Sequence, residues 1–471
     1  MVSCGMNKDI KILKDPITNE SIHPVTYADA VYLNNGTRLE DNIRYLMRRV
    51  SVIGDLNKLE TNEKRSIVAA LNEVYKRNGN QAQYGVRFVD SNPEGIRLGD
   101  AVGLEASAYY GDNLVYNHSD FNRIFPWSNI KRCIIDDDGN ILAYENEPGF
   151  RTDPKKGNIF VEIPKFYQKI VYENNTLEMW IAPYEINGDD QYWLNPAFID
   201  DNGKELQYIY IGAYEAAYEY NTEKQRNEIF SKSNLNILGD KTIDELRDMA
   251  RLQGDFKLID IYERNIMEFL FCIEFATLNS QTIFAGKNNY ENVLIADKPR
   301  KTGEVETGLD YPNMSLGNYH TNSFRYRYME NIWGNTGEFI DGLIIKDSKV
   351  YVASKSDAYG NFDLYSELCD ISSANKCYFI TSRFNNKAVP YIAVPVPCNE
   401  GNNESFYCDC VAYPSSNEEK AYVVGYPHTL KASEELSVLG NGLFSVNMDI
   451  PATARNKDIT SRLVYKKRSR A

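Results

Sequence analysis

The spacing of apolar residues near the N-terminus constrains the fold of this chain more than any other feature. Apolar side chains recur there at alternating intervals of four and three residues, which is the a/d rhythm of a coiled coil. The first seam consists of Leu39, Ile43, Leu46, Val50 and Ile53, and the second of Ile67, Leu71 and Val74. Seams this short are marginal alone, and isoleucine at several of these positions favours more than two strands. We therefore expect a trimeric coiled coil over residues 39–78; the alternative is a helical hairpin within one chain.

The segments on either side of the coil differ from it in composition. Residues 1–38 are rich in turns, because Asp15-Pro16 and His23-Pro24 interrupt any helix. Residues 76–85 are polar and contain glycine, which is typical of a linker. We expect a large head over residues 86–465, whose length permits two subdomains, and a solvated basic tail over residues 466–471.

Short strands dominate the predicted head, which we assign to the α+β class. Alternating apolar runs cover residues 133–135, 159–163 and 208–214, and Asp-Gly steps close hairpins between such runs. Two helices interrupt this pattern. One begins after Thr242, where Glu245 completes a capping box, and the other runs from Ile261 to about Leu278 with one apolar face.

Charge and cysteine usage exclude several classes of function. The 471 residues include 66 acidic and 52 basic side chains, and a net charge of −14 repels nucleic acid. No run reaches the roughly 20 apolar residues of a membrane span, and no secretory signal is visible, so we expect assembly in a cytoplasm. Three cysteines, Cys398, Cys408 and Cys410, lack a histidine at ligand spacing. We expect free thiols, no metal and no cofactor.

Two N-terminal segments resemble parts of bacteriophage fibres. The first resembles the docking end of phage head fibres, and tail fibres use similar openings; the residues that we expect to dock are Pro24, Val25, Thr26, Ala30, Val31 and Tyr32. The second, Ile53-Gly54-Asp55-Leu56 through Val74, resembles a coil that recurs in trimeric phage fibre and baseplate proteins. These resemblances imply a homotrimer attached to capsid or tail proteins.

The head resembles gut-phage and prophage proteins with a C-type-lectin fold, shared with formylglycine-generating enzymes and the variable proteins of diversity-generating retroelements. The residues that carry this resemblance are Arg97–Gly103, Phe125–Trp127, Val161–Tyr167, Asn195–Phe198, Glu330–Asn335, Phe339–Gly342 and Ser461–Tyr465. We expect Trp333, Gly334 and Asn335 to form a core turn, with Asn335 bonded to its own backbone, and Asp341 to be structural. The resemblance implies architecture more than activity.

An enzymatic function is disfavoured by the residues present. No cysteine follows Cys410, so the copper and thiol chemistry of the formylglycine-generating enzymes has no ligands. Glycoside hydrolysis needs two carboxylates, for which Glu330, Glu338 and Asp341 are candidates, but acidic residues are numerous enough for close pairs to arise without function. We therefore expect a virion surface fibre that is not an enzyme. A tail-fibre receptor-binding protein is the alternative, and a cell-surface polysaccharide hydrolase a more distant one.

Aromatic residues late in the head are the candidates for ligand binding. They lie in or near loops around 355–365 and 399–435, mixed with small polar residues, which suits recognition of a host-surface glycan or protein. These residues are Tyr351, Tyr359, Phe362, Tyr365, Tyr407, Tyr413, Tyr422 and Tyr426. The alternative is that the same rings pack the loops of the head against one another.

Overall fold

The computed structural model divides the chain into two compact units, residues 1–78 and 79–471. The structure describes residues 82–466, apart from gaps at 108–118, 187, 255, 285, 287–300, 308–322, 354–357, 373–376, 385, 387–388, 397–404 and 427–441. The predicted docking segment, the predicted coiled coil and the predicted tail from Lys467 onward lie outside the described residues. The described residues belong to the second unit, which we call the head.

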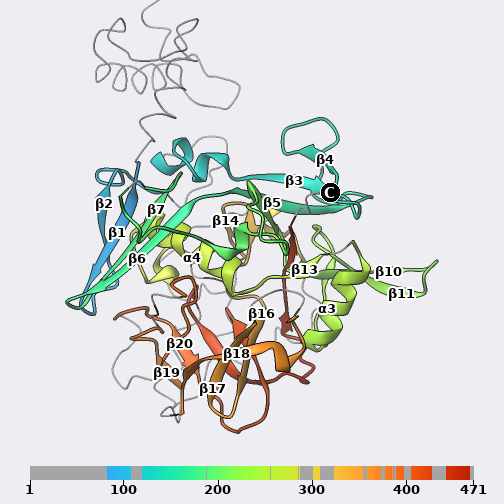
Figure 1. Cartoon of the computed structure of the whole chain (residues 1–471). Helices are drawn as coiled ribbons and strands as arrows, with labels where there is room; N and C mark the ends of the chain where they lie inside the picture. Colours follow the sequence, from blue (N-terminus) through green and yellow to red (C-terminus); the bar gives the residue numbers. More distant parts are fainter. Residues whose placement is uncertain are drawn as a thin grey trace, which may run out of the picture. The chain divides into compact units, whose positions relative to one another are not determined.

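Three larger sheets form most of the described head (Figure 1). The five-stranded sheet has the order β2 (Ile96–Gly99), β1 (Tyr84–Val89), β7 (Thr176–Ala182), β6 (Tyr167–Glu173) and β8 (Trp193–Leu194). The six-stranded sheet has the order β13 (Lys257–Leu258), β24 (Leu463–Tyr465), β9 (Tyr208–Gly212), β5 (Asn158–Pro164), β3 (Lys131–Ile135) and β4 (Ile141–Tyr144). The strands predicted at residues 133–135 and 159–163 are thus confirmed as β3 and β5.

The third sheet is built from the C-terminal part of the chain. Its order is β18 (Tyr365–Asp370), β17 (Lys349–Ala353), β16 (Gly337–Lys346), β21 (Lys420–Val424), β22 (Val446–Pro451), β20 (Cys410–Ala412) and β19 (Cys377–Phe379), and β23 (Ile459–Thr460) joins β16. Smaller sheets comprise β10 (Ala217–Asn221), β11 (Arg226–Phe230) and β12 (Asn236–Ile237), and β14 (Arg325–Tyr326) with β15 (Met329–Glu330). The ten-residue β16 is longer than the short strands expected here.

The helix predicted after Thr242 is confirmed as α3 (Ile243–Leu252). The Thr242 hydroxyl accepts from the Glu245 backbone N–H, and the Glu245 carboxylate accepts from the Thr242 backbone N–H. This reciprocal cap satisfies two backbone donors that the helix cannot pair internally. The start of α3 is therefore set by local chemistry that the sequence already displays.

The second helix, α4 (Ile261–Phe275), lies in the middle of the head and packs against β1, β7 and β16 (Figure 1). Asp260 caps its first turn, and it ends before Ala276, which has a left-handed backbone with φ of 52°. Residues 261–274 are all buried, so the prediction of a single apolar face is wrong. A helix surrounded by sheets buries every side, and its charged residues must then find partners inside the protein.

The four charged side chains of α4 find those partners on distant segments. Glu263 pairs with Lys466, Glu268 with Arg383 and Glu274 with Arg327, while Arg264 donates to the backbone oxygen of Ile332. Lys466 was expected in the solvated tail, and this expectation is wrong, because its side chain is only 11% exposed beside Glu263. The buried carboxylate attracts the ammonium group and removes it from solvent.

The predicted core turn at Trp333 is present, with one difference. Gly334 and Asn335 both have a left-handed backbone, with φ of 72° and 58°, and the buried indole of Trp333 packs 4.3 Å from the ring of Phe324. The Asn335 amide, however, donates to Glu215 at 2.7 Å, which differs from the predicted bond to its own backbone. A carboxylate is the stronger acceptor and lies within reach of the turn.

The described head is thus rich in strands and contains two α-helices, in agreement with the expected α+β class. Its largest cluster of buried apolar residues draws on all three large sheets and on α4. Within the described ranges, no helix combines the length and the apolar character that crossing a bilayer requires. Of the cysteines, Cys133, Cys272, Cys369, Cys408 and Cys410 carry free thiols, whereas Cys398 lies outside the described residues.

Candidate functional site

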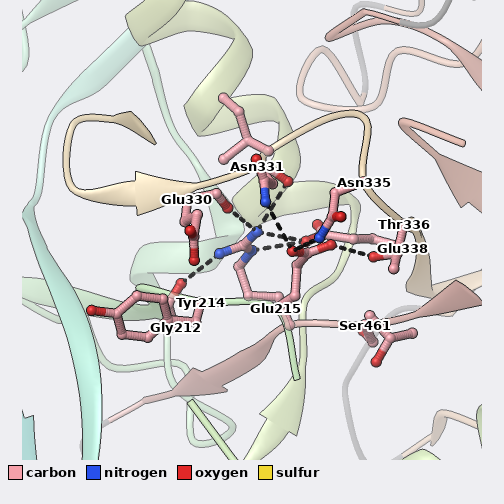
Figure 2. Close-up of polar contacts among 12 residues, drawn as sticks. Gly212, Tyr214, Glu215, Glu330, Asn331, Asn335, Thr336, Glu338 and Ser461 are labelled. Atoms are coloured by element: carbon pink, nitrogen blue, oxygen red, sulfur yellow. Dashed lines mark hydrogen bonds and ion pairs between the residues drawn. The ribbon is translucent and has the colours of Figure 1, made fainter. Parts of the chain in front are cut away.

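Two of the three carboxylates considered as catalytic candidates, Glu330 and Glu338, lie in the interior of the head. We call the group formed by Glu215, Glu330, Glu338 and Arg462 the carboxylate centre (Figure 2). Each of its four side chains is at most 2% exposed. They come from the loop after β9, from β15, from β16 and from the residue before β24, so that tertiary packing assembles them.

Every arm of the Arg462 guanidinium in the carboxylate centre has an acceptor. Nε and one terminal nitrogen donate to Glu338 Oε1 at 3.0 and 2.7 Å. The terminal nitrogens also donate to the backbone oxygens of Gly212 at 3.0 Å and Glu330 at 2.7 Å. A buried guanidinium with this many acceptors joins β9, β15 and β16 at one point, which is a structural role.

Glu215 is the acceptor for the turn that follows Trp333. Figure 2 shows the side chains of Asn331, Asn335 and Thr336 pointing toward its carboxylate, and all three donate to it. Burial raises the pKa of Glu215 above its ordinary value, against the opposing effect of the hydrogen bond from Thr336. The carboxylate is enclosed by the donors that it holds in place.

Glu330 fixes a further segment of the chain. Its carboxylate accepts from the backbone N–H groups of Gly303 at 2.6 Å and Val305 at 3.2 Å. Burial, with a contribution from nearby Glu215, raises the pKa of Glu330 to about 8. A carboxyl with a pKa of this kind suits a general acid only where a substrate can reach it, and Glu330 is 1% exposed.

The third catalytic candidate, Asp341, lies apart from the carboxylate centre in a different ion pair. Its carboxylate accepts from the Arg247 guanidinium of α3 at 2.8 Å, and both side chains are buried. It also accepts from the backbone N–H of Gly342, at the point where the register of β16 shifts against β21. The ion pair between Arg247 and Asp341 therefore links α3 to β16 of the eight-stranded sheet.

Half of the aromatic residues predicted to bind a ligand are buried in the head. These are Tyr359, Tyr407, Tyr413 and Tyr422, each at most 7% exposed. The Tyr359 hydroxyl donates to Asp260 Oδ2 at 2.7 Å, which links the loop after β17 to the cap of α4. Tyr359, Tyr413 and Tyr422 are thus packed inside the head, whereas Tyr407 also belongs to the lining of a pocket described below. Tyr426 is partly buried, and its hydroxyl accepts from the Asn456 amide at 2.9 Å.

The other three predicted residues lie together at one edge of the eight-stranded sheet. The rings of Tyr351 and Phe362 meet edge to face at 5.0 Å, and those of Phe362 and Tyr365 stack at 6.3 Å. We call these three residues the β17–β18 aromatic group. All three are partly exposed, and the Lys346 ammonium covers the Phe362 ring at 4.4 Å. One ring face is therefore already occupied by a cation within the chain.

A pocket of about 620 Å³ lies elsewhere, where the turn between β6 and β7 meets two C-terminal loops. We call it the β6–β7 pocket, and its volume is within the range of small-molecule sites. Its lining residues are Phe88, Asp90, Ser91, Tyr172, Glu173, Asn174, Asn175, Thr176, Leu177, Leu278, Thr381, Ser382, Arg383, Phe406 and Tyr407. Tyr407 is the only member of this lining that the sequence had marked as a ligand-binding residue.

The shape of the β6–β7 pocket depends on a tight hairpin turn. Asn174 and Asn175 have left-handed backbones, with φ of 49° and 58°, as a two-residue turn of the primed type requires. The Asn175 backbone oxygen accepts from the Asp90 N–H at 2.8 Å, and the Ser91 oxygen accepts from the Phe406 N–H at 2.7 Å. These bonds hold the end of β1 between the hairpin and the loop at Phe406.

The wall of the pocket combines aromatic rings with buried polar atoms. A hydrogen bond joins the hydroxyls of Tyr172 and Tyr407, and burial raises the pKa of both phenols. Arg383 forms a bidentate ion pair with Glu268 at 2.7 and 3.0 Å. Within the described part of the chain, Arg383 Nε and Thr381 Oγ1 are buried without a hydrogen-bond partner. A buried polar atom without a partner costs free energy, because it has lost its hydrogen bonds to water.

Sequence reasoning missed this pocket because its lining comes from four separate parts of the chain. The signal that could have found part of it is Asn174-Asn175 between two alternating runs, which predicts a hairpin turn with exposed amides. Nothing local connects that turn with Arg383 or Phe406.

Comparison with known proteins does not identify a function for the pocket, because no protein-family model matches the chain and no curated protein matches it in sequence.

Proposed function

We propose that this chain is a structural fibre of a bacteriophage virion: a homotrimer, docked to the capsid through residues 1–38, that presents C-type-lectin-like heads to host-surface or environmental glycans. The sequence resemblances given above support the fibre, the docking segment and the coil. The strand-rich head with a central helix is compatible with the proposed lectin-like architecture. The residues that would dock and trimerise lie outside the described part of the chain.

The β6–β7 pocket is the observation that supports glycan binding. Its rings, Tyr172, Phe406 and Tyr407, offer apolar surface against which the C–H face of a sugar can lie. The amides of Asn174 and Asn175 and the hydroxyls on its rim can exchange hydrogen bonds with sugar hydroxyls. Three heads on one trimer would make three weak contacts act together.

Binding is favoured over catalysis because the acidic residues proposed for hydrolysis are enclosed. Glu330, Glu338 and Asp341 are at most 2% exposed, and each is engaged with backbone N–H groups or an arginine. A glycosidase needs two carboxylates on opposite sides of a sugar ring. These three have protein groups where the sugar would have to lie.

The first test measures the mass and the glycan binding of the full-length protein together. Light scattering should give three times the chain mass of 53.9 kDa, and a glycan array should retain the protein. A matched variant, Ile67→Asp with Leu71→Asp, places charges in the predicted seam and should be monomeric. Because its heads are intact, it should bind each glycan with the same affinity per head but dissociate faster from an array.

Two outcomes would contradict the proposal. A monomeric full-length protein would remove the trimer, and a protein that binds no glycan would remove the lectin function. Infection by phage that lack the chain distinguishes the two attachment sites. A capsid decoration should be dispensable for infection, whereas a tail-fibre receptor-binding protein should not be.

A further inference from the structure

The charges around the β6–β7 pocket restrict the kind of glycan that it can accept. This inference rests on the proposed function. Asp90 and Glu173 line the pocket, and both are solvent-exposed at its rim. Of the described lining residues, Arg383 is the only one with a positive charge. The rim therefore presents two carboxylates to anything that enters.

The positive charge of Arg383 is already balanced. Both terminal nitrogens of its guanidinium donate to the Glu268 carboxylate of α4, at 2.7 and 3.0 Å. Its face packs against the rings of Tyr407 and Phe444, whose centroids lie 5.6 and 5.4 Å from the guanidinium carbon. An anionic ligand would have to compete with a bidentate buried pair, which is unfavourable.

The lining offers hydrogen bonds that carry no net charge. The Ser382 hydroxyl and the Asn174 and Asn175 amides are exposed and can pair with a sugar hydroxyl or an acetamido oxygen. Arg383 Nε and Thr381 Oγ1 have no partner within the described residues, but both atoms are closed to solvent. The apolar side chains of Leu177 and Leu278 in the same lining would suit the methyl group of an acetamido substituent.

We propose that the β6–β7 pocket selects uncharged glycans, built from neutral hexose or N-acetylhexosamine units, and rejects glycans that carry carboxylate or phosphate groups. The two rim carboxylates repel the anion, and the neutralised arginine gives it no compensation. The rejection is electrostatic at the rim, so it should weaken as salt screens these exposed charges.

The test compares two disaccharides of similar size with the full-length protein by titration calorimetry. The probes are N,N′-diacetylchitobiose, which is neutral, and digalacturonate, which carries two carboxylates. The neutral sugar should bind at least tenfold more tightly at low salt. The double variant Asp90→Asn, Glu173→Gln should then bind digalacturonate about tenfold better and leave the affinity for diacetylchitobiose unchanged.

Both substitutions suit the backbone. Asp90 has a φ of 52°, a left-handed conformation that asparagine tolerates, and Glu173 is exposed at the end of β6. The control is Asp248→Asn with Glu223→Gln, which removes the same charge from two exposed positions outside the lining. It should change neither affinity.

The outcomes separate this inference from the proposed function. If digalacturonate binds as tightly as diacetylchitobiose, or more tightly, the inference is wrong while glycan binding stands. If the double variant and the control improve digalacturonate binding equally, the rim carboxylates are not the selective element. If neither these sugars nor any glycan on an array binds, the lectin function fails, and the inference with it.

Discussion

The carboxylate centre and the β6–β7 pocket both contain polar side chains around an arginine, but the two arginines differ in how many of their nitrogen atoms have hydrogen-bond partners. Arg462 has an acceptor for each arm, and its neighbour Glu215 accepts from three side chains. Arg383 is paired with Glu268 yet keeps a buried Nε without a partner beside an open pocket. Glu338 Oε2 of the carboxylate centre is also buried without a partner, so an unpartnered atom does not by itself mark a binding site. The difference is that Arg383 belongs to the lining of a pocket, whereas the side chains of the carboxylate centre are enclosed by the protein.

The carboxylate centre and the β6–β7 pocket also differ in their distance from solvent. The carboxylate centre lies where three sheets and the Trp333 turn meet, so that burial dominates its electrostatics and raises the pKa values of Glu215 and Glu330. The pocket is formed by chain turns at the margin of the five-stranded sheet. A carboxyl with a raised pKa is therefore a poor guide to function in this protein, because burial is the largest cause of the shift.

The largest expected effect comes from breaking the carboxylate centre. Arg462→Leu removes the cation and leaves Glu338 buried without its partner, so we expect the free energy of unfolding to fall by about 3–5 kcal/mol. Urea unfolding followed by tryptophan fluorescence measures it. The matched control is Arg455→Ala, which breaks the exposed ion pair with Glu245 and should cost less than about 1 kcal/mol. Equal losses in the two variants would show that the centre is not structural.

A second effect should appear in the pH dependence of stability. In the folded protein the pKa of Glu330 is about 8, against an ordinary value of 4.5. Between these values the folded state retains a proton that the unfolded state has released, so the contribution of Glu330 to stability is greatest below pH 4.5 and falls as pH rises toward 8. The slope from this single group is at most about 1.4 kcal/mol per pH unit.

Glu330→Gln removes that titration, so the variant should lose less stability than the parent between pH 5 and pH 8. Its absolute stability should also fall, because an amide cannot accept from both the Gly303 and Val305 N–H groups with its two ends. The slope and not the absolute value is the measurement, taken from urea unfolding at several pH values. A matched exposed substitution, Glu223→Gln, should leave the slope unchanged. If Glu330→Gln also leaves it unchanged, Glu330 ionises normally in the fold.

The smallest effect concerns binding and separates the pocket from the β17–β18 aromatic group. Phe406→Ala removes one ring of the pocket lining, and we expect about tenfold weaker binding of diacetylchitobiose, equal to about 1.4 kcal/mol. The matched variant Phe362→Ala removes a similarly exposed ring from the aromatic group and should bind normally. The reverse result would move the binding site to the residues that the sequence had suggested.

The sequence by itself determined where some helices and turns begin, because these boundaries depend on neighbouring residues. The capping box at Thr242 and Glu245 predicts the start of α3, and the Asp138-Gly139 step predicts the turn between β3 and β4. The left-handed turn after Trp333 is of the same kind, since glycine and asparagine tolerate its backbone. These features depend on residues within a few positions of one another, so the sequence alone suffices to predict them.

Only the tertiary structure decided which side chains share an environment. Periodicity could not show that α4 is buried on every side, nor that Lys466 leaves the tail to pair with Glu263. Nor could it bring Tyr172 to Tyr407, 235 positions further along, or distinguish the buried Tyr359 from the half-exposed Phe362. Burial and pairing depend on how sheets far apart in the sequence pack together, and no local pattern records that packing.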